Sequence, residues 1–270
     1  MSWDHPEIRE AIERALREDI GAGDVTTEAC VPENQQASGF FLTREPLILA
    51  GLELLPLIYH AEKIELLAHD GDRLDAETIF ARVNGSARRL LTLERTALNL
   101  IQRTCGIATQ AGRFADAVAG TGCNVLDTRK TIPGLRRLEK LAVKAGGCFN
   151  HRMGLYDAVL IKNNHIAAAG GVRQAFEACK ASGLPVEIEV RSFVELDEAL
   201  AVGADHILLD NFTPEQLGQA VERINGRAKV EASGGITLET VRAFAEAGAD
   251  FVSAGALTHS APAADISFRL

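Results

Sequence analysis

The sequence predicts an α/β protein with two parts, an amino-terminal part rich in antiparallel strands and a barrel of parallel βα units. The character of the sequence changes near residue 100, and before that point β-rich stretches alternate with turn signals. From about residue 120, six short apolar runs alternate with helical stretches, which is typical of parallel strands joined by right-handed crossovers. Glycines follow the last two apolar runs, as in barrels whose final loops bind phosphate.

The first predicted domain covers residues 1–105. A helix from about Pro6 to Glu18 leads into the glycine-rich turn GAGD, and three β-rich stretches follow. The turn signals Asp70-Gly71-Asp72 and Asn84-Gly85 favour antiparallel pairing of these strands. A helix rich in Ala and Leu, near Ala87 to Ile101, connects this domain to the rest of the chain.

The second predicted domain covers residues 106–270, with a C-terminal tail that could return to the first domain. Its strand-like runs are NVLD, AVLIK, VEIEV, HILLD, KVEAS and FVSAG. A doubly wound sheet would also fit this alternation. The number of βα units and the two glycine-rich strand ends favour a barrel.

Composition narrows the class of protein. The chain has 270 residues, of which 47% are hydrophobic and 24% are charged, as in ordinary soluble globular proteins. No apolar run approaches the roughly 20 residues that span a bilayer, and the charged amino terminus does not resemble a signal peptide. We therefore expect a cytoplasmic protein without a membrane partner. The formal net charge of −9 argues against a nucleic-acid partner.

The five cysteines are far apart and form no CxxC pair. A zinc site or a disulfide framework would need closer spacing. We expect reduced thiols that pack as small apolar side chains.

In a βα barrel the catalytic residues lie at the carboxyl ends of the strands. Here those ends read Asp127-Thr128-Arg129-Lys130, Lys162-Asn163-Asn164-His165, Glu189 with Arg191, Asp210-Asn211, Ser233-Gly234-Gly235 and Ala254-Gly255-Ala256. Basic groups follow the early strands, acids the middle strands and glycines the last two. This order predicts a pocket for a small molecule.

The glycine-rich ends indicate a phosphate site. Ser233-Gly234-Gly235 follows a strand and precedes a helix expected near Thr237, and Gly255 closes the next strand. Backbone N–H groups at such a position bind phosphate, and glycine allows the close approach and the positive φ that this requires. The alternative is a plain tight turn after each strand.

The cations at the early strand ends indicate an anionic ligand, and they are Arg129, Lys130, His151, Arg152 and Lys162. Arg presents a planar fork that suits carboxylate or phosphate, and Lys offers a compact charge. Solvated surface charge is the usual alternative.

That alternative fits Lys162 poorly, because an apolar run leads directly into it. It fits Arg136, Arg137 and Lys140, which lie on a predicted helix and which we expect to be exposed.

Glu189 and Asp210 end two otherwise apolar strands. Two carboxylates on neighbouring strands can hold Mg²⁺, which also binds substrate phosphate oxygens. They could instead contact sugar hydroxyls, stabilise a developing positive charge, or pair with a nearby Arg or Lys.

Several long motifs closely resemble the quinolinate phosphoribosyltransferase family, in the right order over essentially the whole chain. The motifs are EDIGAGDVTT, ERTALNL, DTRKTIPGLRRLEKLAVKAGG, NHRMGLYDAVLIKNNH, LLDNF, EASGG and GALTHS. The resemblance implies an N-terminal α/β sandwich-like domain, followed by an incomplete TIM-like α/β barrel. It also implies a homodimer, with higher oligomers possible.

The same resemblance implies that the enzyme joins quinolinate to the phosphoribosyl group of phosphoribosyl pyrophosphate (PRPP), with loss of carbon dioxide and pyrophosphate. The quinolinate pocket would use Thr128, Arg129, Lys130, His151, Arg152 and Lys162, with Arg95 entering from the partner subunit. Glu189 and Asp210 would lie near the ribose and its Mg²⁺, which is carried by the pyrophosphate. Residues 233–235 and 254–256 would hold the 5′-phosphate. The catalytic group would comprise Lys130, Lys162, Glu189 and Asp210.

Two positions depart from the family pattern. Asn163 stands where an acid is common, and Cys105 stands where Ser is common. Neither is among the expected direct ligands, so we expect the reaction to be unchanged.

Three other functions fit part of the pattern. The molybdenum-transport-associated homologue is similar in sequence and would take another anionic substrate, but LIKNNH, with Lys162, favours the quinolinate enzyme. A Schiff-base aldolase could use Lys162, yet a small aldol substrate does not require so many cations. A non-catalytic module for a phosphorylated metabolite leaves the two acids unexplained.

Overall fold

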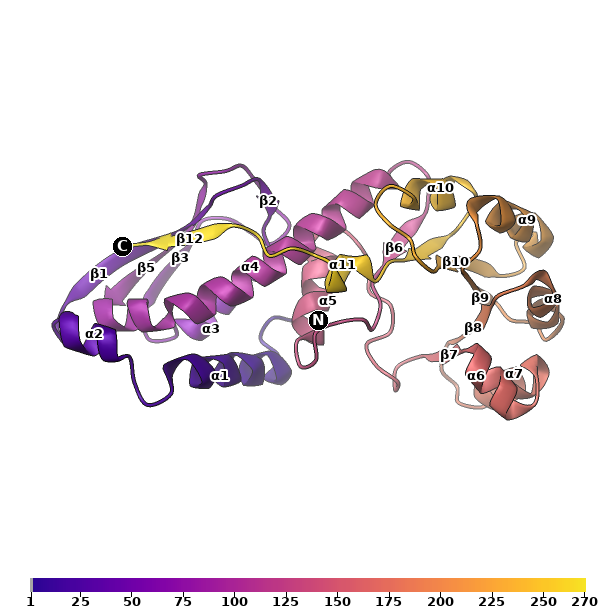
Figure 1. Ribbon diagram of the computed structural model, residues 1–270, viewed down its shortest axis with the longest axis horizontal. Coiled ribbons are helices and arrows are strands. Elements are labelled where there is room, and N and C mark those ends of the chain that lie inside the picture. Colours follow the sequence, from indigo (N-terminus) through magenta and orange to yellow (C-terminus); the bar gives the residue numbers. More distant parts are fainter. Residues whose placement is uncertain (1) are drawn as a thin grey trace. The chain divides into compact units, whose positions relative to one another are not determined.

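The computed structural model describes residues 2–270, which divide into two compact units (Figure 1). Unit 1 contains the residues up to Gly112, together with Thr131–Gly147 and Thr258–Leu270. Unit 2 contains Arg113–Lys130 and Cys148–Leu257. The sequence analysis placed one boundary after residue 105, whereas the chain passes between the compact units more than once.

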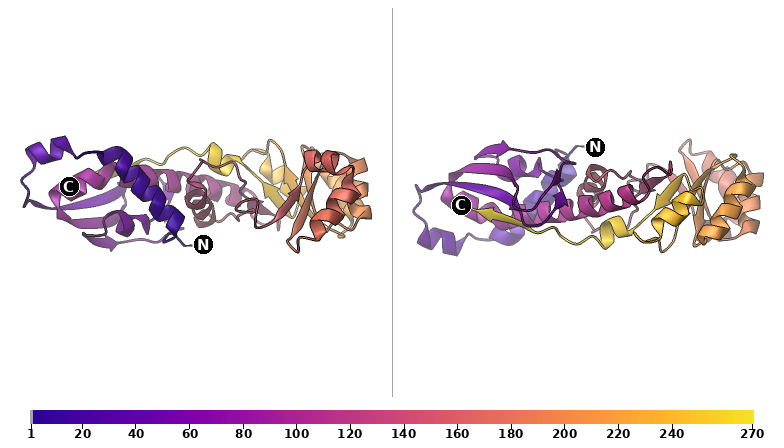
Figure 2. Two further views of the ribbon diagram at one scale, coloured as in Figure 1. Left: turned by 90° about the horizontal axis from the view of Figure 1, so that it is seen from below. Right: turned by 90° about the horizontal axis from the view of Figure 1, so that it is seen from above.

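Unit 1 is built on a four-stranded antiparallel sheet with the order β12-β1-β5-β3. Its strands are β1 (Gln36–Thr43), β3 (Lys63–Leu66), β5 (Ile79–Ser86) and β12 (Ile266–Arg269). A second, two-stranded sheet pairs β2 (Leu47–Ile48) with β4 (Arg73–Leu74). The C-terminal strand β12 lies beside β1, with Phe40 opposite Arg269 (Figure 2). The C-terminal tail therefore completes the sheet that the first part of the chain begins.

The core of unit 1 is an aromatic cluster around Phe41. The rings of Tyr59, Phe80 and Phe268 have centroids 6.2, 6.1 and 4.8 Å from that of Phe41. All four side chains are buried. Tilted and edge-on pairs at such distances stabilise a core beyond the burial of apolar area alone.

The helices of unit 1 include α1 (Pro6–Ile20), α2 (Val25–Cys30), α3 (Leu54–Ile58) and α5 (Arg136–Ala145). The GAGD turn ends in Asp24, whose carboxylate accepts a hydrogen bond from the Thr27 N–H at 3.0 Å. Asp24 is thus the N-cap of α2, since a side-chain oxygen there satisfies a backbone donor that the helix leaves unpaired.

Helix α4 (Ala87–Ala117) has 31 residues and extends well beyond the Ile101 at which the sequence analysis ended it. Buried positions continue at helical spacing through Ile101, Cys105, Ala108 and Ala111. The apolar stripe of α4 therefore remains packed against a core beyond Ile101, and the helix continues to Ala117.

Unit 2 contains a parallel sheet of six strands with the order β6-β11-β10-β9-β8-β7. The strands are β6 (Asn124–Leu126), β7 (Val159–Ile161), β8 (Val186–Val190), β9 (His206–Asp210), β10 (Lys229–Ser233) and β11 (Phe251–Ser253). The order runs in one direction and β6 pairs with β11, so the strands wind around as in a barrel. A doubly wound sheet would reverse its order instead. Because β6 does not pair with β7, the barrel is incomplete.

Helices cover the outer face of this sheet (Figure 1). They are α6 (Asn163–Ala169), α7 (Val172–Lys180), α8 (Phe193–Ala201), α9 (Pro214–Ile224) and α10 (Val241–Glu246), and the short α11 (Ala256–His259) follows β11. Helix α9 shows why they form where they do. Thr213 and Gln216 make a capping box, Pro214 occupies the first turn, and Asn225 ends the helix with φ 48°. No helix among residues 2–270 is long and apolar enough to cross a membrane.

The expectation that the basic residues of α5 are exposed needs correction. Lys140 is fully buried and Arg137 forms a salt bridge with Glu7, with Nη2 and Oε1 3.0 Å apart. These residues of α5 are therefore not solvated surface charges, because α5 is covered within unit 1.

The cysteines follow the expectation only in part. Cys105, Cys123 and Cys148 are buried free thiols, whereas Cys30 is exposed and Cys179 is half-buried. Burial raises the pKa of Cys105 to about 12, so this side chain behaves as a neutral, apolar group.

A buried ion pair lies within unit 1. Arg103 donates to Oε1 of the fully buried Glu139 from Nε and Nη2, at 3.0 and 2.7 Å. Arg103 also donates to the carbonyl groups of Thr258 and Ala261. One guanidinium thus connects α4, α5 and the C-terminal segment.

We predict that Arg103→Met lowers the free energy of unfolding of unit 1 by about 3–5 kcal/mol, because it leaves the Glu139 carboxylate buried and unpaired. Urea unfolding followed by the fluorescence of Trp3, the only tryptophan, measures this loss. Arg9→Met, which removes an exposed pair with Asp4, should change stability little. Equal losses in the two variants would contradict this view of the buried pair.

Candidate active site

Glu189 and Asp210 lie at the carboxyl ends of the adjacent strands β8 and β9, as the sequence predicted, and Arg191 joins them. Arg191 Nη2 is 3.2 Å from Glu189 Oε1, and its Nε is 3.3 Å from Asp210 Oδ2. Glu189 is buried, whereas Asp210 is half-buried. The sequence analysis named Arg191 at a strand end but gave it no role. In the structure it occupies the space between the two acids.

Lys162 ends the neighbouring strand β7 and reaches toward the same acids. Its Nζ is 3.9 Å from Glu189 Oε2, and the side chain is 49% exposed. Its backbone N–H donates to His165 Nδ1 at 2.9 Å, which fixes the start of α6. Lys162 thus presents a charge at the strand ends that has an acid beside it and open space in front of it.

The segment that carries His151 and Arg152 is attached to β6 by the buried carboxylate of Asp127. Asp127 accepts hydrogen bonds from Asn150 Nδ2 at 2.7 Å and from the His151 N–H at 2.9 Å. The backbone of Phe149 also bridges to Leu126 of β6. The sequence analysis noted Asp127 only as part of a strand end. The sequence signal that could have indicated its role is that Asp127 directly follows a buried strand and precedes a cationic stretch.

Arg129 and Arg152 influence each other electrostatically in this region. Burial lowers the pKa of Arg152, and the positive charge of Arg129 lowers it further, whereas the carboxylates of Glu187 and Asp157 offset part of this effect. The Arg152 side chain donates from Nη1 to the Ala158 carbonyl at 3.2 Å. Guanidinium groups form charge-assisted hydrogen bonds with carboxylate and phosphate, so these two side chains are suited to binding such a group.

The loop after β10 exposes backbone donors. Gly234 and Gly235 have φ values of 104° and 62°, and among the described residues their N–H groups have no hydrogen-bond acceptor. A Cβ atom at Gly234 would lie 2.3 Å from Asn211 Oδ1. Only glycine fits there, and consecutive free amides of this kind form an anion-binding loop.

The last loop, at residues 254–256, follows β11 and is tied to the neighbouring strand β6. The Ala254 N–H donates to the Leu126 carbonyl at 3.0 Å, and α11 begins at Ala256. After β10, by contrast, α10 begins at Val241 and not near Thr237 as expected. A loop, and not a helix terminus, therefore follows the two glycines.

Three predicted residues remain, namely Thr128, Lys130 and Arg95. Thr128 Oγ1 accepts the Lys130 N–H at 3.0 Å, and the Lys130 side chain is exposed. Arg95 is exposed on α4, within unit 1.

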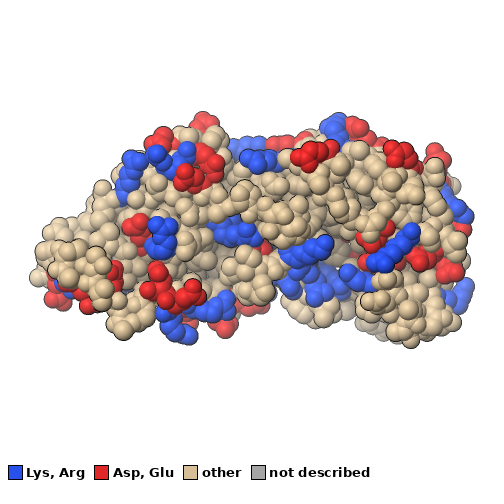
Figure 3. All heavy atoms as spheres, in the orientation of Figure 1, with Lys and Arg blue, Asp and Glu red and all other residues tan. Residues whose placement is uncertain are grey.

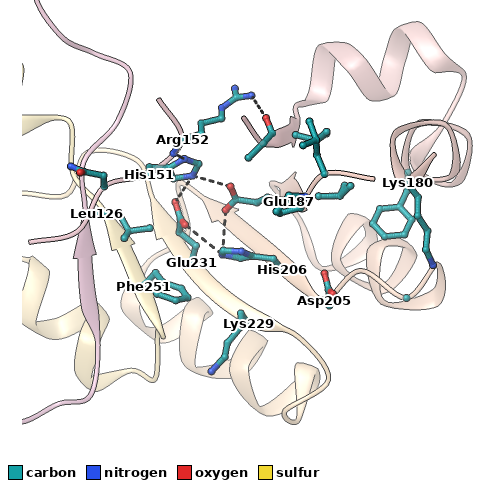
Figure 4. Close-up of a pocket in the computed structure, with 18 residues that line it drawn as sticks. Leu126, His151, Arg152, Lys180, Glu187, Asp205, His206, Lys229, Glu231 and Phe251 are labelled. Carbon is teal, nitrogen blue, oxygen red and sulfur yellow. Dashed lines mark hydrogen bonds and ion pairs between the residues drawn. The ribbon is translucent and has the colours of Figure 1, made fainter. Parts of the chain in front are cut away.

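Below the strand ends, the inner face of the sheet carries a polar layer of which the sequence analysis named only His151. It contains His151, Glu187, His206 and Glu231 (Figure 4). His151 Nε2 lies 2.9 Å from Glu187 Oε2 and 3.5 Å from Glu231 Oε1. The signal was present in VEIEV, because residues two apart in a strand share a face, so Glu187 points the same way as Glu189.

The acids of this layer affect one another's titration. Burial would raise the pKa of Glu187, but the hydrogen bond and charge of His151 outweigh it and lower that pKa. Burial raises the pKa of Glu231. Burial would lower the pKa of His206, but the neighbouring carboxylates, first Glu231, raise it.

A cavity of about 640 Å³ opens beside this layer (Figure 4). Its wall includes the first residue of several strands, namely Val159, Val186, His206, Lys229 and Phe251. It therefore lies at the amino ends of the strands, away from the free amides and the Glu189–Asp210 pair. It shares only His151 and Arg152 with the predicted substrate residues.

The donor atoms at the carboxyl ends suit Mg²⁺. Glu189 and Asp210 supply carboxylate oxygens on adjacent strands, and Mg²⁺ prefers one or two such ligands together with substrate phosphate oxygens. Arg191 now contacts both carboxylates. Direct binding of an ion to both would require this side chain to turn away.

The surface charge is mixed. On the face shown in Figure 3, acidic and basic side chains of the described residues are interspersed, apart from one group of Lys and Arg to the right of the centre. This agrees with a chain whose net charge is −9.

Comparisons with known proteins match the whole length of the chain. The sequence profile of the quinolinate phosphoribosyl transferase N-terminal domain matches residues 24–105, and that of the C-terminal domain matches residues 107–269. The chain is 43% identical to nicotinate-nucleotide pyrophosphorylase [carboxylating] of Mycobacterium leprae, over 97% of this chain and 96% of that protein. It is 42% identical to the chloroplastic Arabidopsis thaliana protein of the same name, over 98% and 84%.

A solved structure agrees with these matches. The nicotinate-nucleotide pyrophosphorylase of Francisella tularensis is 38% identical, with a TM-score of 0.93 over 98% of this chain and 97% of that one. The expected fold, an N-terminal α/β domain followed by an incomplete α/β barrel, is confirmed. The chain therefore belongs to the quinolinate phosphoribosyltransferase family.

Proposed function

We propose that this protein transfers the phosphoribosyl group of PRPP to quinolinate and removes one carboxylate, giving nicotinate mononucleotide, carbon dioxide and pyrophosphate in NAD biosynthesis. The observation that supports this most directly is the set of cations at the early strands, namely Arg129 and Arg152, whose charges act on each other, and the half-exposed Lys162. A pyridine dicarboxylate supplies two negative charges for such a site. The name "carboxylating" that relatives carry describes the reverse direction of the same reaction.

Quinolinate binds through its two carboxylates. In this proposal Arg129, Arg152 and Lys162 hold them, with Thr128, Lys130 and His151 at the border of the pocket. Positioning of this kind aims the ring nitrogen at the anomeric carbon and contributes several kcal/mol to lowering the barrier, up to about 7–11 kcal/mol in ideal cases.

The ribose phosphate binds at the other side of the strand ends. The free N–H groups of Gly234 and Gly235 donate to the 5′-phosphate, with Ser233 and residues 254–256 completing the loop pair. Mg²⁺, held by the pyrophosphate and by Glu189 or Asp210, neutralises charge on the leaving group when it is bound.

The first chemical step forms one bond and breaks one. The ring nitrogen donates its lone pair to the anomeric carbon, and the bond to pyrophosphate breaks with its electrons on the leaving oxygen. Positive charge develops on the ribose, where Glu189 and Asp210 stabilise it electrostatically.

The second step removes the carboxylate next to the ring nitrogen. The carbon–carbon bond breaks, carbon dioxide leaves, and the electron pair stays on the ring carbon beside the cationic nitrogen. A proton then adds to that carbon. Lys162 or Lys130 supplies or positions this proton.

The defining test uses purified protein with quinolinate, PRPP and Mg²⁺. We expect nicotinate mononucleotide and carbon dioxide in equal amounts, dependent on all three additions. Nicotinate should be a poor substitute, because a monocarboxylate leaves part of the cationic pocket unpaired. Folded protein that forms no product would contradict the proposal.

We predict that Lys162→Ala lowers kcat/KM for quinolinate by roughly 100-fold or more, because it removes a charge that faces the substrate. The fold should be retained, since the side chain is half-exposed. Lys229→Ala is the matched control, because this lysine begins β10 and lies at the opposite ends of the strands. Near-normal activity of Lys162→Ala would remove Lys162 from the mechanism.

We predict that Gly234→Ala raises KM for PRPP by about tenfold or more, as expected for losing charge-assisted hydrogen bonds, while KM for quinolinate changes little. The added Cβ would collide with Asn211 and move the donor amides. Gly203→Ala has a similar positive φ of 77° but open space around it, so it controls for backbone strain alone. An equal effect of both variants would show that strain, and not phosphate binding, is responsible.

We also propose that the protein is a homodimer in which the exposed Arg95 completes the partner's active site. Arg95→Ala and Lys162→Ala should each be inactive alone. When the two variants are coexpressed, about a quarter of all active sites should be functional. Random pairing makes half of the dimers mixed, and each mixed dimer has one intact site out of two. No recovery in mixed dimers would place Arg95 in its own subunit's site or outside the mechanism.

A further inference from the structure

Three buried polar atoms lie together on the inner face of the sheet, next to the cavity. Glu187 Oε1, His206 Nε2 and Glu231 Oε2 are each buried and have no hydrogen-bond partner. His206 Nε2 is 3.5 Å from each of the two oxygens. The side chains come from the adjacent strands β8, β9 and β10 and point toward one another (Figure 4).

The other oxygen of each carboxylate is already held by the protein. His151 Nε2 lies 2.9 Å from Glu187 Oε2, and Ser253 Oγ donates to Glu231 Oε1. Each carboxylate is therefore oriented through one oxygen and turns the other toward His206. Carboxylates that bind metal ions are commonly oriented by hydrogen bonds in this manner.

His151 is not the third ligand, although it lies as close to both acids as His206 does. Its Nδ1 accepts the Arg152 N–H at 2.7 Å, so the ring proton resides on Nε2 and is donated to Glu187. Neither nitrogen of His151 has a lone pair left for an ion. His206 Nε2 has no such hydrogen bond.

Charge and spacing both favour a divalent ion at this point. Glu187 and Glu231 are 5% and 0% exposed, and two buried carboxylates are costly unless a cation compensates them. A tetrahedral Zn²⁺ with bonds of about 2.0–2.1 Å separates its ligand atoms by about 3.3 Å. The two separations from His206 Nε2, to Glu187 Oε1 and to Glu231 Oε2, are both 3.5 Å and are close to that spacing.

We propose that Glu187, His206 and Glu231 bind Zn²⁺, with the fourth position open to the cavity. The ion ties the inner faces of β8, β9 and β10 together and neutralises the two acids. Through the second oxygen of Glu187 it also steadies His151. This site lies at the opposite end of the strands from the Mg²⁺ of the substrate and binds without PRPP.

The test is metal binding by the untagged full-length protein after treatment with a chelator, in the absence of both substrates. We expect one Zn²⁺ per chain by elemental analysis and a rise in Tm on addition of Zn²⁺. Co²⁺ in place of Zn²⁺ should give the intense visible absorption of a tetrahedral or five-coordinate site. These measurements do not depend on activity, so they stand or fall separately from the proposed function.

Two variants test the assignment of ligands. His206→Leu should abolish the Co²⁺ absorption, and the milder Ser253→Ala should weaken Zn²⁺ affinity by about 10–100-fold, because it frees the Glu231 carboxylate. The controls are Asp205→Asn, which changes an acid on the cavity wall, and His69→Leu, which removes an exposed histidine of unit 1. Both control variants should bind Zn²⁺ and Co²⁺ as the original protein does. Less than one ion per chain, or an unchanged spectrum in His206→Leu, would overturn the proposal and leave a shared proton as the charge that balances the acids.

Discussion

The buried carboxylate of Asp127 is the constraint on which the site depends. The barrel is open between β6 and β7, and the segment that crosses this gap has only a single β-bridge to β6, between Phe149 and Leu126. Asp127 accepts hydrogen bonds from both Asn150 and the His151 backbone, and thereby adds a second attachment of that segment to β6. Arg152 follows directly in the chain, so its position depends on both attachments.

The two ends of the same strands carry different polar groups. At the carboxyl ends, Lys162 and Arg191 lie with the acids Glu189 and Asp210, and the loop after β10 adds the free amides of Gly234 and Gly235. Toward the amino ends, Glu187 and Glu231 are buried on the inner face. These acids compensate part of the charge above them, as the contact between His151 and Glu187 shows. An interior that is purely apolar, as in many barrels, would leave such a concentration of positive charge without this support.

The barrel was predictable because six apolar runs of similar length alternate with helices, and because the period of two in each strand assigns its inner and outer faces. Glu189, Asp210 and Lys162 could be placed at one edge on that basis, since parallel strands end together. The position of the gap between β6 and β7 could not be foreseen, because no local pattern shows that two consecutive strands do not pair. The length of α4 was underestimated because the sequence analysis ended the helix with its stretch rich in Ala and Leu. The helix in fact continues as long as its apolar side chains pack against a core. Lys140 was assigned to the surface because it lies on a predicted helix, yet tertiary packing buries it completely.

The sequence by itself determined the order of strands and helices, the polar residues at the strand ends and the glycines that only a positive φ explains. These properties are local, because they depend on residues within one turn or one strand. Only the tertiary structure decided that Arg191 bridges two acids, that Asp127 anchors the cationic segment, and that His206 meets Glu187 and Glu231. Those contacts join strands and loops that are distant along the chain, and their geometry depends on the twist and closure of the sheet. No local pattern encodes the distance between two such side chains, so it emerges only when the barrel is formed.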